Sequence, residues 1–239
     1  MSMKPFGILG GMGPGAGIYF AEKVIAATPA TVDQEHIPFI LYNDPSIPDR
    51  TKSVTDGNLD RLVGAITNAL KTLEDLGVSE IFIPCNTSFV GYAHYEHAVG
   101  CQVYHLPHRT LDVIAENDNR GQVLLLATKG SYLAHVYKHH HSIEVLYPDD
   151  AQQKVVMSLI YDVVKSARPH AKDDILGLLD PVMSDMRVPV ILGCTELSML
   201  ANDFRSRWPE VTFIDPLEIA ATYVVARYER ARGETRSHG

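Results

Sequence analysis

The sequence predicts an α/β protein built from two similar, doubly wound lobes, each with a parallel four-stranded sheet and with the active site in the cleft between them. Three observations predict this fold. Short apolar segments alternate with longer amphipathic segments along the 239 residues, as strands and helices do in α/β proteins. Several short segments are apolar throughout, as expected for strands covered on both faces. The two halves of the chain also repeat one plan.

In the first half, short apolar segments such as FGIL and FILY indicate strands, and amphipathic segments between them indicate helices. A glycine-rich turn follows the first strand, and Pro14 in this turn is suited to the first turn of a helix. The predicted strands are residues 6–9, 39–42, 81–83 and 103–106. The predicted helices are residues 16–27 and 56–76.

In the second half, the same alternation continues to the end of the chain. The predicted strands are residues 123–127, 143–146, 190–192 and 212–214. The predicted helices are residues 131–140, 152–167, 172–185 and 217–232. The polar tail ETRSHG is expected to fray.

The repeated plan indicates a weak internal duplication. The first half contains FGILGGMGPGAG and later EIFIPCNTSF, and the second contains QVLLLATKGSYL and later VPVILGCTEL. In each half one strand ends in a turn of small residues, and a later strand ends at a cysteine followed by polar residues. We therefore expect a first lobe over residues 1–103, joined by the returning residues 213–239, and a second lobe over residues 104–212.

Composition excludes several classes of function. The net charge of −8 disfavours a nucleic-acid or anionic-membrane partner, although a small anionic substrate remains possible. No apolar segment approaches the roughly 20 residues of a membrane span, and the N-terminus lacks the layout of a signal peptide. The three cysteines are far apart in sequence, which favours a reducing, cytoplasmic setting over a disulfide framework.

Two of these cysteines are the candidate catalytic residues. Cys85 and Cys194 each follow a predicted strand, at the sheet edge where α/β proteins bind ligands. A turn into a helix follows each thiol, and helix N-terminal amides favour a thiolate. The alternative is that each is a small buried apolar residue, the usual role of free cysteine. Their corresponding positions in the two halves favour the catalytic interpretation, whereas Cys101 is interpreted as structural.

Two opposed thiols suit the racemisation of an amino acid. One thiolate removes the Cα proton, and the other thiol returns a proton to the opposite face. Fixed hydrogen-bond donors must then stabilise the planar, carbanion-like state. The polar residues behind the two thiols are suitable donors, although hydroxyl residues there also commonly cap helices. These candidates are Asn86, Thr87, Ser88 and Thr195.

Two rival interpretations concern a cofactor and a metal. The turn GGMGPGAG follows a strand as a dinucleotide-binding loop does, with Asp44 as the possible ribose ligand, but its spacing departs from G-x-G-x-x-G. His139, His140 and His141 are consecutive, so on a helix they would point about 100° apart and could not converge on one ion. We therefore expect neither a cofactor nor a metal.

The motifs GILGGMGPGA, IPDRT, PCNTS, LLATKG and ILGCTEL occur in that order along nearly the whole chain. Together they closely resemble the aspartate/glutamate racemase family, and its aspartate racemase branch in particular. The resemblance implies racemisation of aspartate or glutamate without pyridoxal phosphate, Cys85 and Cys194 as the catalytic pair, and commonly a homodimer. It implies these substrate-binding positions: Met12, Arg50, Asn86, Thr87, Thr128, Lys165 and Thr195.

Arg50 and Lys165 are the cations that an acidic substrate requires, since its two carboxylates call for at least one positive partner. Without the resemblance, Lys165 is equally suited to the last turn of a helix. Two departures from the family affect substrate choice: Ser88-Phe89 replaces a common Ala-His, and Gly17 stands where Thr is frequent. Related two-thiol enzymes isomerise maleate, racemise hydantoins or decarboxylate malonates, and a non-catalytic amino-acid-binding protein is the more distant alternative.

Overall fold

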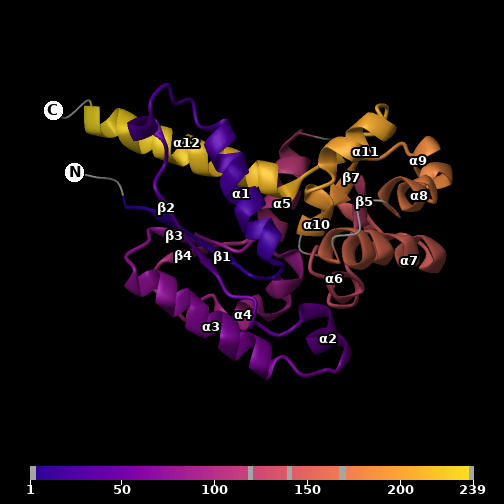
Figure 1. Ribbon diagram of the computed structural model, residues 1–239, viewed down its shortest axis with the longest axis horizontal. Helices are drawn as coiled ribbons and strands as arrows, with labels where there is room; N and C mark the ends of the chain where they lie inside the picture. The colour runs from indigo at the N-terminus through magenta and orange to yellow at the C-terminus, as the bar shows by residue number, and fades with distance from the viewer. Residues whose placement is uncertain (1–3, 118–120, 139–141, 167–170, 237–239) are drawn as a thin grey trace.

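The computed structural model describes residues 4–117, 121–138, 142–166 and 171–236. Its strands form two four-stranded parallel sheets, one in each half of the chain, as predicted (Figure 1). The described residues include no helix that is both long enough and apolar enough to cross a membrane. His139, His140 and His141, which we predicted not to converge on one metal ion, lie outside the described residues.

The first sheet has the order β2-β1-β3-β4. Apolar residues such as Phe6 and Ile8 are fully buried in its centre, because helices cover both faces. Its strands are β1 (Phe6–Gly10), β2 (Phe39–Asn43), β3 (Glu80–Phe82) and β4 (Gln102–Tyr104). The helices of this half are α1 (Pro14–Ala27), α2 (Arg50–Thr55), α3 (Asp60–Asp75), α4 (Tyr92–Tyr95) and α5 (Leu106–Asn117).

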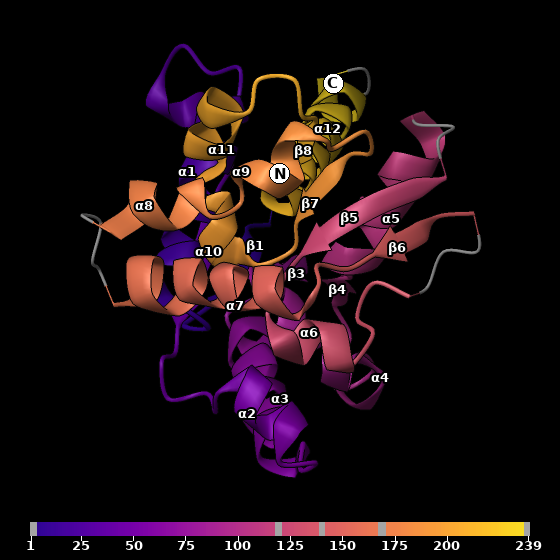
Figure 2. The ribbon, with the colours of Figure 1, turned by 90° about the vertical axis from the view of Figure 1, so that its right-hand side faces the viewer.

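The second sheet has the corresponding order β6-β5-β7-β8, and its edge and centre are visible in Figure 2. Its strands are β5 (Gln122–Leu126), β6 (Glu144–Leu146), β7 (Val190–Leu192) and β8 (Phe213–Ile214). Its helices are α6 (Lys129–Leu133), α7 (Asp150–Ser158), α8 (Lys172–Gly177), α9 (Asp180–Ser184), α10 (Thr195–Ser198) and α11 (Ala201–Arg207). A π-helix over Leu159–Lys165 continues α7.

The shared order makes the two cysteines equivalent in topology. In each sheet the first strand pairs with the second on one side and with the third on the other, so the winding direction reverses between the first and third strands. Ligands bind at such a reversal, beyond the carboxyl ends of the strands. Cys85 follows β3 and Cys194 follows β7, which are the third strands of the two sheets.

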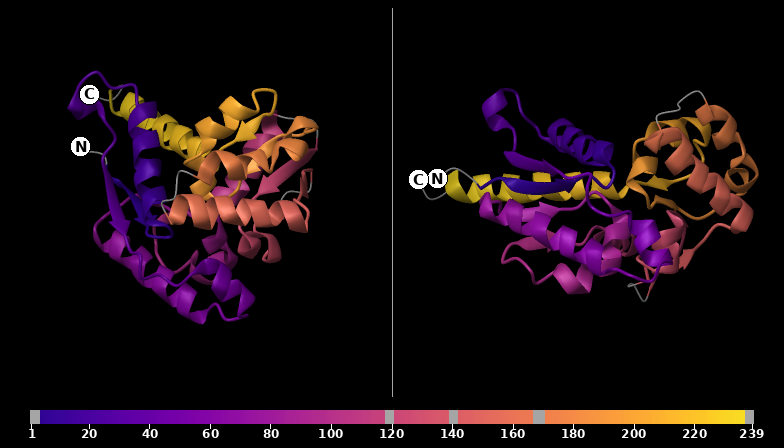
Figure 3. Two further views of the ribbon diagram at one scale, coloured as in Figure 1. Left: turned by 45° about the vertical axis from the view of Figure 1, so that its right-hand side comes forward. Right: turned by 60° about the horizontal axis from the view of Figure 1, so that its bottom comes forward.

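The last helix, α12 (Pro216–Arg236), returns across the first half of the molecule (Figures 1 and 3). It packs against α1 and α5, and Arg227 on it forms a 2.7 Å ion pair with the buried Glu80 of β3. Strand β8 pairs with β7, so residues 213–214 belong by hydrogen bonding to the second sheet, one strand beyond the expected boundary after residue 212. The division into lobes by residue range otherwise stays a prediction.

Several helices differ from the predicted ones. The helix predicted over 56–76 begins later, as α3 at Asp60, because Gly57 adopts a left-handed conformation, with φ +67°, and an unpredicted helix, α2, ends before it at Thr55. The segment 172–185 is likewise divided into α8 and α9. Helix α6 ends at Leu133, earlier than predicted, and α5 begins at Leu106, where a strand was predicted to end.

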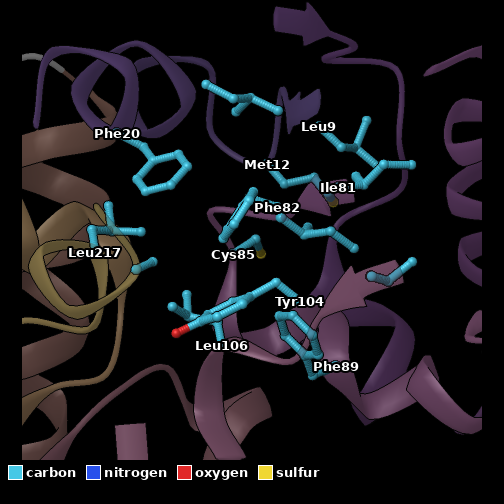
Figure 4. Packing of buried hydrophobic residues seen from close by; sticks show 14 of the residues in the cluster. Leu9, Met12, Phe20, Ile81, Phe82, Cys85, Phe89, Tyr104, Leu106 and Leu217 are labelled. Carbon is cyan, nitrogen blue, oxygen red and sulfur yellow. The ribbon is translucent and has the colours of Figure 1, made fainter. Parts of the chain in front are cut away.

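A core of aromatic and aliphatic side chains supports the first sheet directly beneath Cys85 (Figure 4). The Phe82 ring lies between Phe20, at a centroid distance of 5.4 Å, and Tyr104, at 4.8 Å. Met12 is fully buried in the same cluster. The thiol of Cys85 is therefore carried on a rigidly packed strand end.

Candidate active site

A cavity opens at the carboxyl ends of both sheets. The cavity is lined by Met12, Asp49, Arg50, Thr51, Cys85, Asn86, Thr87, Thr128, Tyr161, Lys165, Cys194, Thr195 and Glu196. Both halves of the chain therefore contribute to one site.

The two thiols occupy matching local positions. Cys85 has extended backbone and immediately precedes the 3₁₀ helix Asn86–Gly91. Cys194 also has extended backbone and immediately precedes α10. Each residue is buried to the same degree, with 5% of its surface exposed, and each lines the cavity. The same strand-end geometry thus presents both sulfur atoms to one cavity.

Arg50 accompanies Cys85. It is the first residue of α2 and is buried, with its Nη1 donating to the carbonyl of Pro48 at 3.3 Å and its Nε without a protein partner. It lines the cavity together with Cys85. Burial lowers the pKa of Arg50, but its interactions with Cys85, Asp49 and Glu196 together raise that pKa. Arg50 is therefore a fixed cation beside this thiol.

Glu196 accompanies Cys194. The Sγ of Cys194 donates to Oε2 of Glu196 at 2.9 Å, and Oε1 of this buried carboxylate lies 3.6 Å from Nζ of Lys165. Burial, followed by the charge of Glu196 and the hydrogen bond to it, raises the pKa of Cys194 well above its usual value. The sequence predicted that helix amides would favour a thiolate here. That expectation is wrong for Cys194, because burial and the carboxylate outweigh the amides.

Lys165 is placed by the π-helix. Its ammonium lies 4.4 Å from the centre of the Tyr161 ring and faces Glu196. Burial lowers the pKa of Lys165, but Glu196, Cys194 and Tyr161 together raise it. The Tyr161 hydroxyl also approaches Thr51 of α2 at 3.5 Å. The π-helix therefore contributes both a cation and a contact across the cavity.

Asn86 presents an unpaired donor. The Tyr137 hydroxyl donates to Oδ1 of Asn86 at 2.8 Å, whereas the buried Nδ2 of Asn86 has no partner in the protein. An amide held by its oxygen must direct its NH₂ group elsewhere. Because Asn86 lines the cavity, this NH₂ group is available to a ligand carboxylate.

Hydroxyl groups join the two halves around the site. The Oγ1 of Thr87 lies 2.8 Å from Oγ1 of Thr128 and 2.9 Å from Oγ of Ser131. On the opposite side, the Thr195 hydroxyl donates to the carbonyl of Pro84 at 3.1 Å. Helix α6 also packs against α2, as Figure 2 shows. Residues of the two halves of the chain are therefore in direct contact around the site.

Nearly all the residues proposed from the sequence reach this cavity. The exception is Ser88, which is fully buried and donates its hydroxyl to the carbonyl of Cys85 at 2.7 Å. It supports the backbone behind the thiol instead of lining the cavity. Cys101 is half-buried and lies outside the cavity lining. The residues brought together as predicted are Met12, Arg50, Cys85, Asn86, Thr87, Thr128, Lys165, Cys194 and Thr195.

Sequence reasoning missed four lining residues: Asp49, Thr51, Tyr161 and Glu196. Glu196 belongs to the motif GCTEL, so its place two residues after a candidate thiol was a usable signal. Tyr161 lies four residues before Lys165 in the same π-helix, and both reach the cavity. Among the described residues, no cluster of three His, Cys, Asp or Glu side chains is arranged to hold a metal.

Comparisons with known proteins agree with this architecture. The family model described as Asp/Glu/hydantoin racemase matches residues 9–224. The broad-specificity amino-acid racemase RacX of Bacillus subtilis is 26% identical over 229 residues, covering 93% of this chain and 97% of RacX. The aspartate racemase of Picrophilus torridus is 28% identical and superposes with a TM-score of 0.82 over 94% of each chain. A glutamate racemase of Bacillus anthracis, 16% identical, shares the fold with a TM-score of 0.71 over 97% of this chain and 84% of its own.

Proposed function

Because the chain belongs to the Asp/Glu/hydantoin racemase family, we propose that it interconverts the L and D forms of aspartate or glutamate without a cofactor. The observation that carries this proposal is the shared cavity, in which Cys85 and Cys194 meet two cations, Arg50 and Lys165. Two proton-transfer groups and positive charge in one cavity are what two-sided proton exchange on an acidic amino acid requires.

The proposed reaction transfers one proton at each face of the substrate. One cysteine thiolate takes the Cα proton, and the electron pair stays on Cα and spreads into the carboxylate. The other cysteine gives its thiol proton to the opposite face of Cα. The unpaired NH₂ group of Asn86 and the cavity hydroxyls are placed to hold the substrate carboxylate while its charge increases.

The acidic substrate is supported by the charges of the cavity. Arg50 offers a forked donor set for a carboxylate, and its Nε is still without a partner. The Picrophilus torridus relative is an aspartate racemase. The RacX relative has broad specificity, so a wider set of amino acids is the second candidate. Other two-thiol chemistries of related enzymes, on maleate, hydantoins or malonates, are further alternatives. A homodimer in the cytoplasm remains a proposal as well.

Chiral chromatography of products from a panel of L- and D-amino acids tests the proposal. We expect aspartate or glutamate to give both enantiomers, at a rate unchanged by added pyridoxal phosphate. Turnover of neutral amino acids at equal or higher kcat/KM would favour the broad-specificity alternative. Turnover of maleate, a hydantoin or a malonate, without any amino acid, would reject the proposed substrate class.

A further inference from the structure

The two thiols share a fold position but have different neighbours. The second residue after Cys85 is Thr87, whose hydroxyl forms hydrogen bonds with the hydroxyls of Thr128 and Ser131. The second residue after Cys194 is Glu196, whose carboxylate contacts the Cys194 sulfur at 2.9 Å. The guanidinium-bearing Arg50 lines the cavity with Cys85, and Cys85 is among the groups that raise its pKa. The duplicated scaffold therefore has a cation at one thiol and an anion at the other.

We infer that Glu196 holds the proton on Cys194 in the resting protein, so that Cys194 acts as the acid and Cys85 as the base in the first half-reaction. This assignment deepens the proposed function and rests on it for its meaning in catalysis. An ionised carboxylate only accepts hydrogen bonds, so a sulfur 2.9 Å from it must donate. A thiolate in that position would place two negative charges side by side in a buried site.

The surroundings of Glu196 include a cation and a hydroxyl group as well as the Cys194 sulfur. Oε1 of the carboxylate lies 3.6 Å from Nζ of Lys165, and the Thr195 hydroxyl approaches Oε2 at 3.5 Å. The charged or titratable groups that act on the Cys194 sulfur are Glu196, Lys165 and the fully buried Tyr137. Glu196 is the only one of these in hydrogen-bond contact with that sulfur among the described residues. Its effect on the pKa of Cys194 exceeds the opposite effect of Lys165.

The assignment gives the two cysteines different tasks in the first half-reaction. Cys85 removes the Cα proton and becomes a thiol. Cys194 gives its proton to the opposite face and becomes a thiolate beside Glu196. The protein then returns to rest when a proton passes from Cys85 to solvent and another reaches Cys194, or when a substrate of the opposite hand reverses both transfers. Protons and electrons balance in either route.

Alkylation by iodoacetamide tests the assignment without measuring racemisation. The Cys101→Ser background leaves only the two cavity thiols, which are equally exposed at 5%, so their rates report thiolate content. Labelling is followed by mass spectrometry from about pH 6 to about pH 9, across the ordinary range of thiol ionisation. We expect Cys85 to be labelled at least about tenfold faster than Cys194 below the upper end of this range.

Glu196→Gln removes the anion and keeps the side-chain size. We expect it to accelerate labelling of Cys194 about tenfold and to move its onset to lower pH, while the rate at Cys85 stays unchanged. Glu196→Asp should restore part of the protection, and Glu22→Gln, on the exposed surface of α1, should behave like the parent.

Faster labelling of Cys194 than of Cys85 in the parent protein overturns the assignment, and so does an unchanged Cys194 rate in Glu196→Gln. If that variant does not fold, the comparison of the two thiols in the parent decides alone. If no amino acid is racemised, the labelling pattern can still be read, so failure of the proposed function is distinguishable from failure of this inference.

Discussion

At the scale of a single residue, the hydroxyl group of Tyr137 orients the amide of Asn86 in the cavity. Its OH group donates to Oδ1 of Asn86 and so leaves the amide NH₂ unpaired and turned to the site. We expect Tyr137→Phe to raise KM or lower kcat for the acidic substrate by about fivefold, since one net hydrogen bond contributes about 1 kcal/mol. Steady-state kinetics in both directions measure the change.

The control for this variant is Tyr95→Phe, because Tyr95 is another fully buried tyrosine, whose hydroxyl donates to the carbonyl of Ser88 outside the cavity lining. Both changes remove a buried hydrogen bond, so both should lower the free energy of unfolding by a similar amount. Equal kinetic effects in the two variants would contradict a positioning role for Tyr137.

The two thiols carry the strongest prediction at this scale. We expect Cys85→Ser and Cys194→Ser each to lower racemisation at least about 100-fold, the usual contribution of a positioned acid or base. Either variant can still exchange the Cα proton of one enantiomer with deuterium, because the remaining thiol faces one side of the substrate. NMR in D₂O measures that exchange. Full two-way racemisation by either variant would contradict the two-base mechanism.

Residue types at strand ends predicted part of the cavity, including Asn86 and Thr195, which follow the two thiols. The family resemblance implied other lining residues, including Arg50 and Thr128. Ser88 does not, since its 3₁₀ helix turns the hydroxyl back to the carbonyl of Cys85. Glu196 was missed although it lies two residues after Cys194; its contact with Lys165, from a distant segment, is the part that no linear pattern contains.

At the scale of elements, the turn after β1 depends on a glycine. Gly11 has φ +100°, and a Cβ on it would lie 2.1 Å from the carbonyl oxygen of Asp44. We expect Gly11→Ala to destabilise the protein by more than about 2 kcal/mol, because strain from a positive φ adds to a clash with backbone atoms. It should also impair the site, since Met12 is the next residue. Urea unfolding and kinetics measure the two effects.

Gly57→Ala is the matched control for this variant. Gly57 also has a positive φ, +67°, but a Cβ there would meet nothing within 4 Å. Gly57→Ala should lower the free energy of unfolding by only about 1 kcal/mol, because it adds only the strain of the left-handed conformation. Similar losses at Gly11 and Gly57 would show that the close approach to Asp44 does not matter.

The elements show where periodicity predicts well and where it does not. Each expected strand is present, because apolar segments bounded by turns are distinctive in a buried parallel sheet. The late start of α3 and the division of 172–185 were missed because amphipathic spacing continues across both points. The π-helix was missed for a related reason: its extra residue per turn follows from tertiary packing and leaves the apolar pattern nearly intact. Helix α5 was not predicted at all, and its first residue, Leu106, was assigned to the preceding strand.

At the scale of the whole molecule, the cavity depends on close contact between α6 and α2. A Cβ on Gly130 would lie 2.8 Å from the Cα of Thr51 and 3.0 Å from Cγ2 of Thr87. We expect Gly130→Ala to hold the halves apart and lower kcat/KM about tenfold or more, since small misplacements of catalytic groups are costly. Alanine is favoured within a helix, so stability should change little.

Gly64→Ala is the control, because Gly64 lies within α3 and a Cβ there meets nothing within 4 Å. It should raise the free energy of unfolding by up to about 1 kcal/mol and leave kinetics unchanged. Unchanged kinetics in Gly130→Ala would show that the contact between α6 and α2 is not needed for catalysis.

A charge cluster couples three helices and makes stability depend on pH. Glu218 of α12 pairs with Arg205 of α11 and Lys23 of α1 at 2.7–2.8 Å. Its hydrogen bond to Arg205 is the largest influence lowering its pKa from 4.5 to about 2. A lowered pKa stabilises the folded state above about pH 4.5, and the contribution is lost as pH falls toward 2.

We expect Glu218→Gln to remove this part of the acid sensitivity. Since the side chain is one-third exposed, solvent screening reduces the contribution to about 1–2 kcal/mol. The gap in the free energy of unfolding between parent and variant should therefore be largest near neutral pH and close below about pH 3. Urea unfolding at several pH values measures it, and a gap that does not narrow on acidification would contradict this assignment.

The unequal residues after the two cysteines, Thr87 and Glu196, have a consequence for the kinetics of a racemase. Mirror-image amino acids have equal free energies in water, so their equilibrium constant is one whatever surrounds each sulfur. The Haldane relationship then makes kcat/KM identical in the two directions. A cation at one thiol and a carboxylate at the other can make the L and D directions differ in kcat, but any such difference must be matched by an equal ratio in KM.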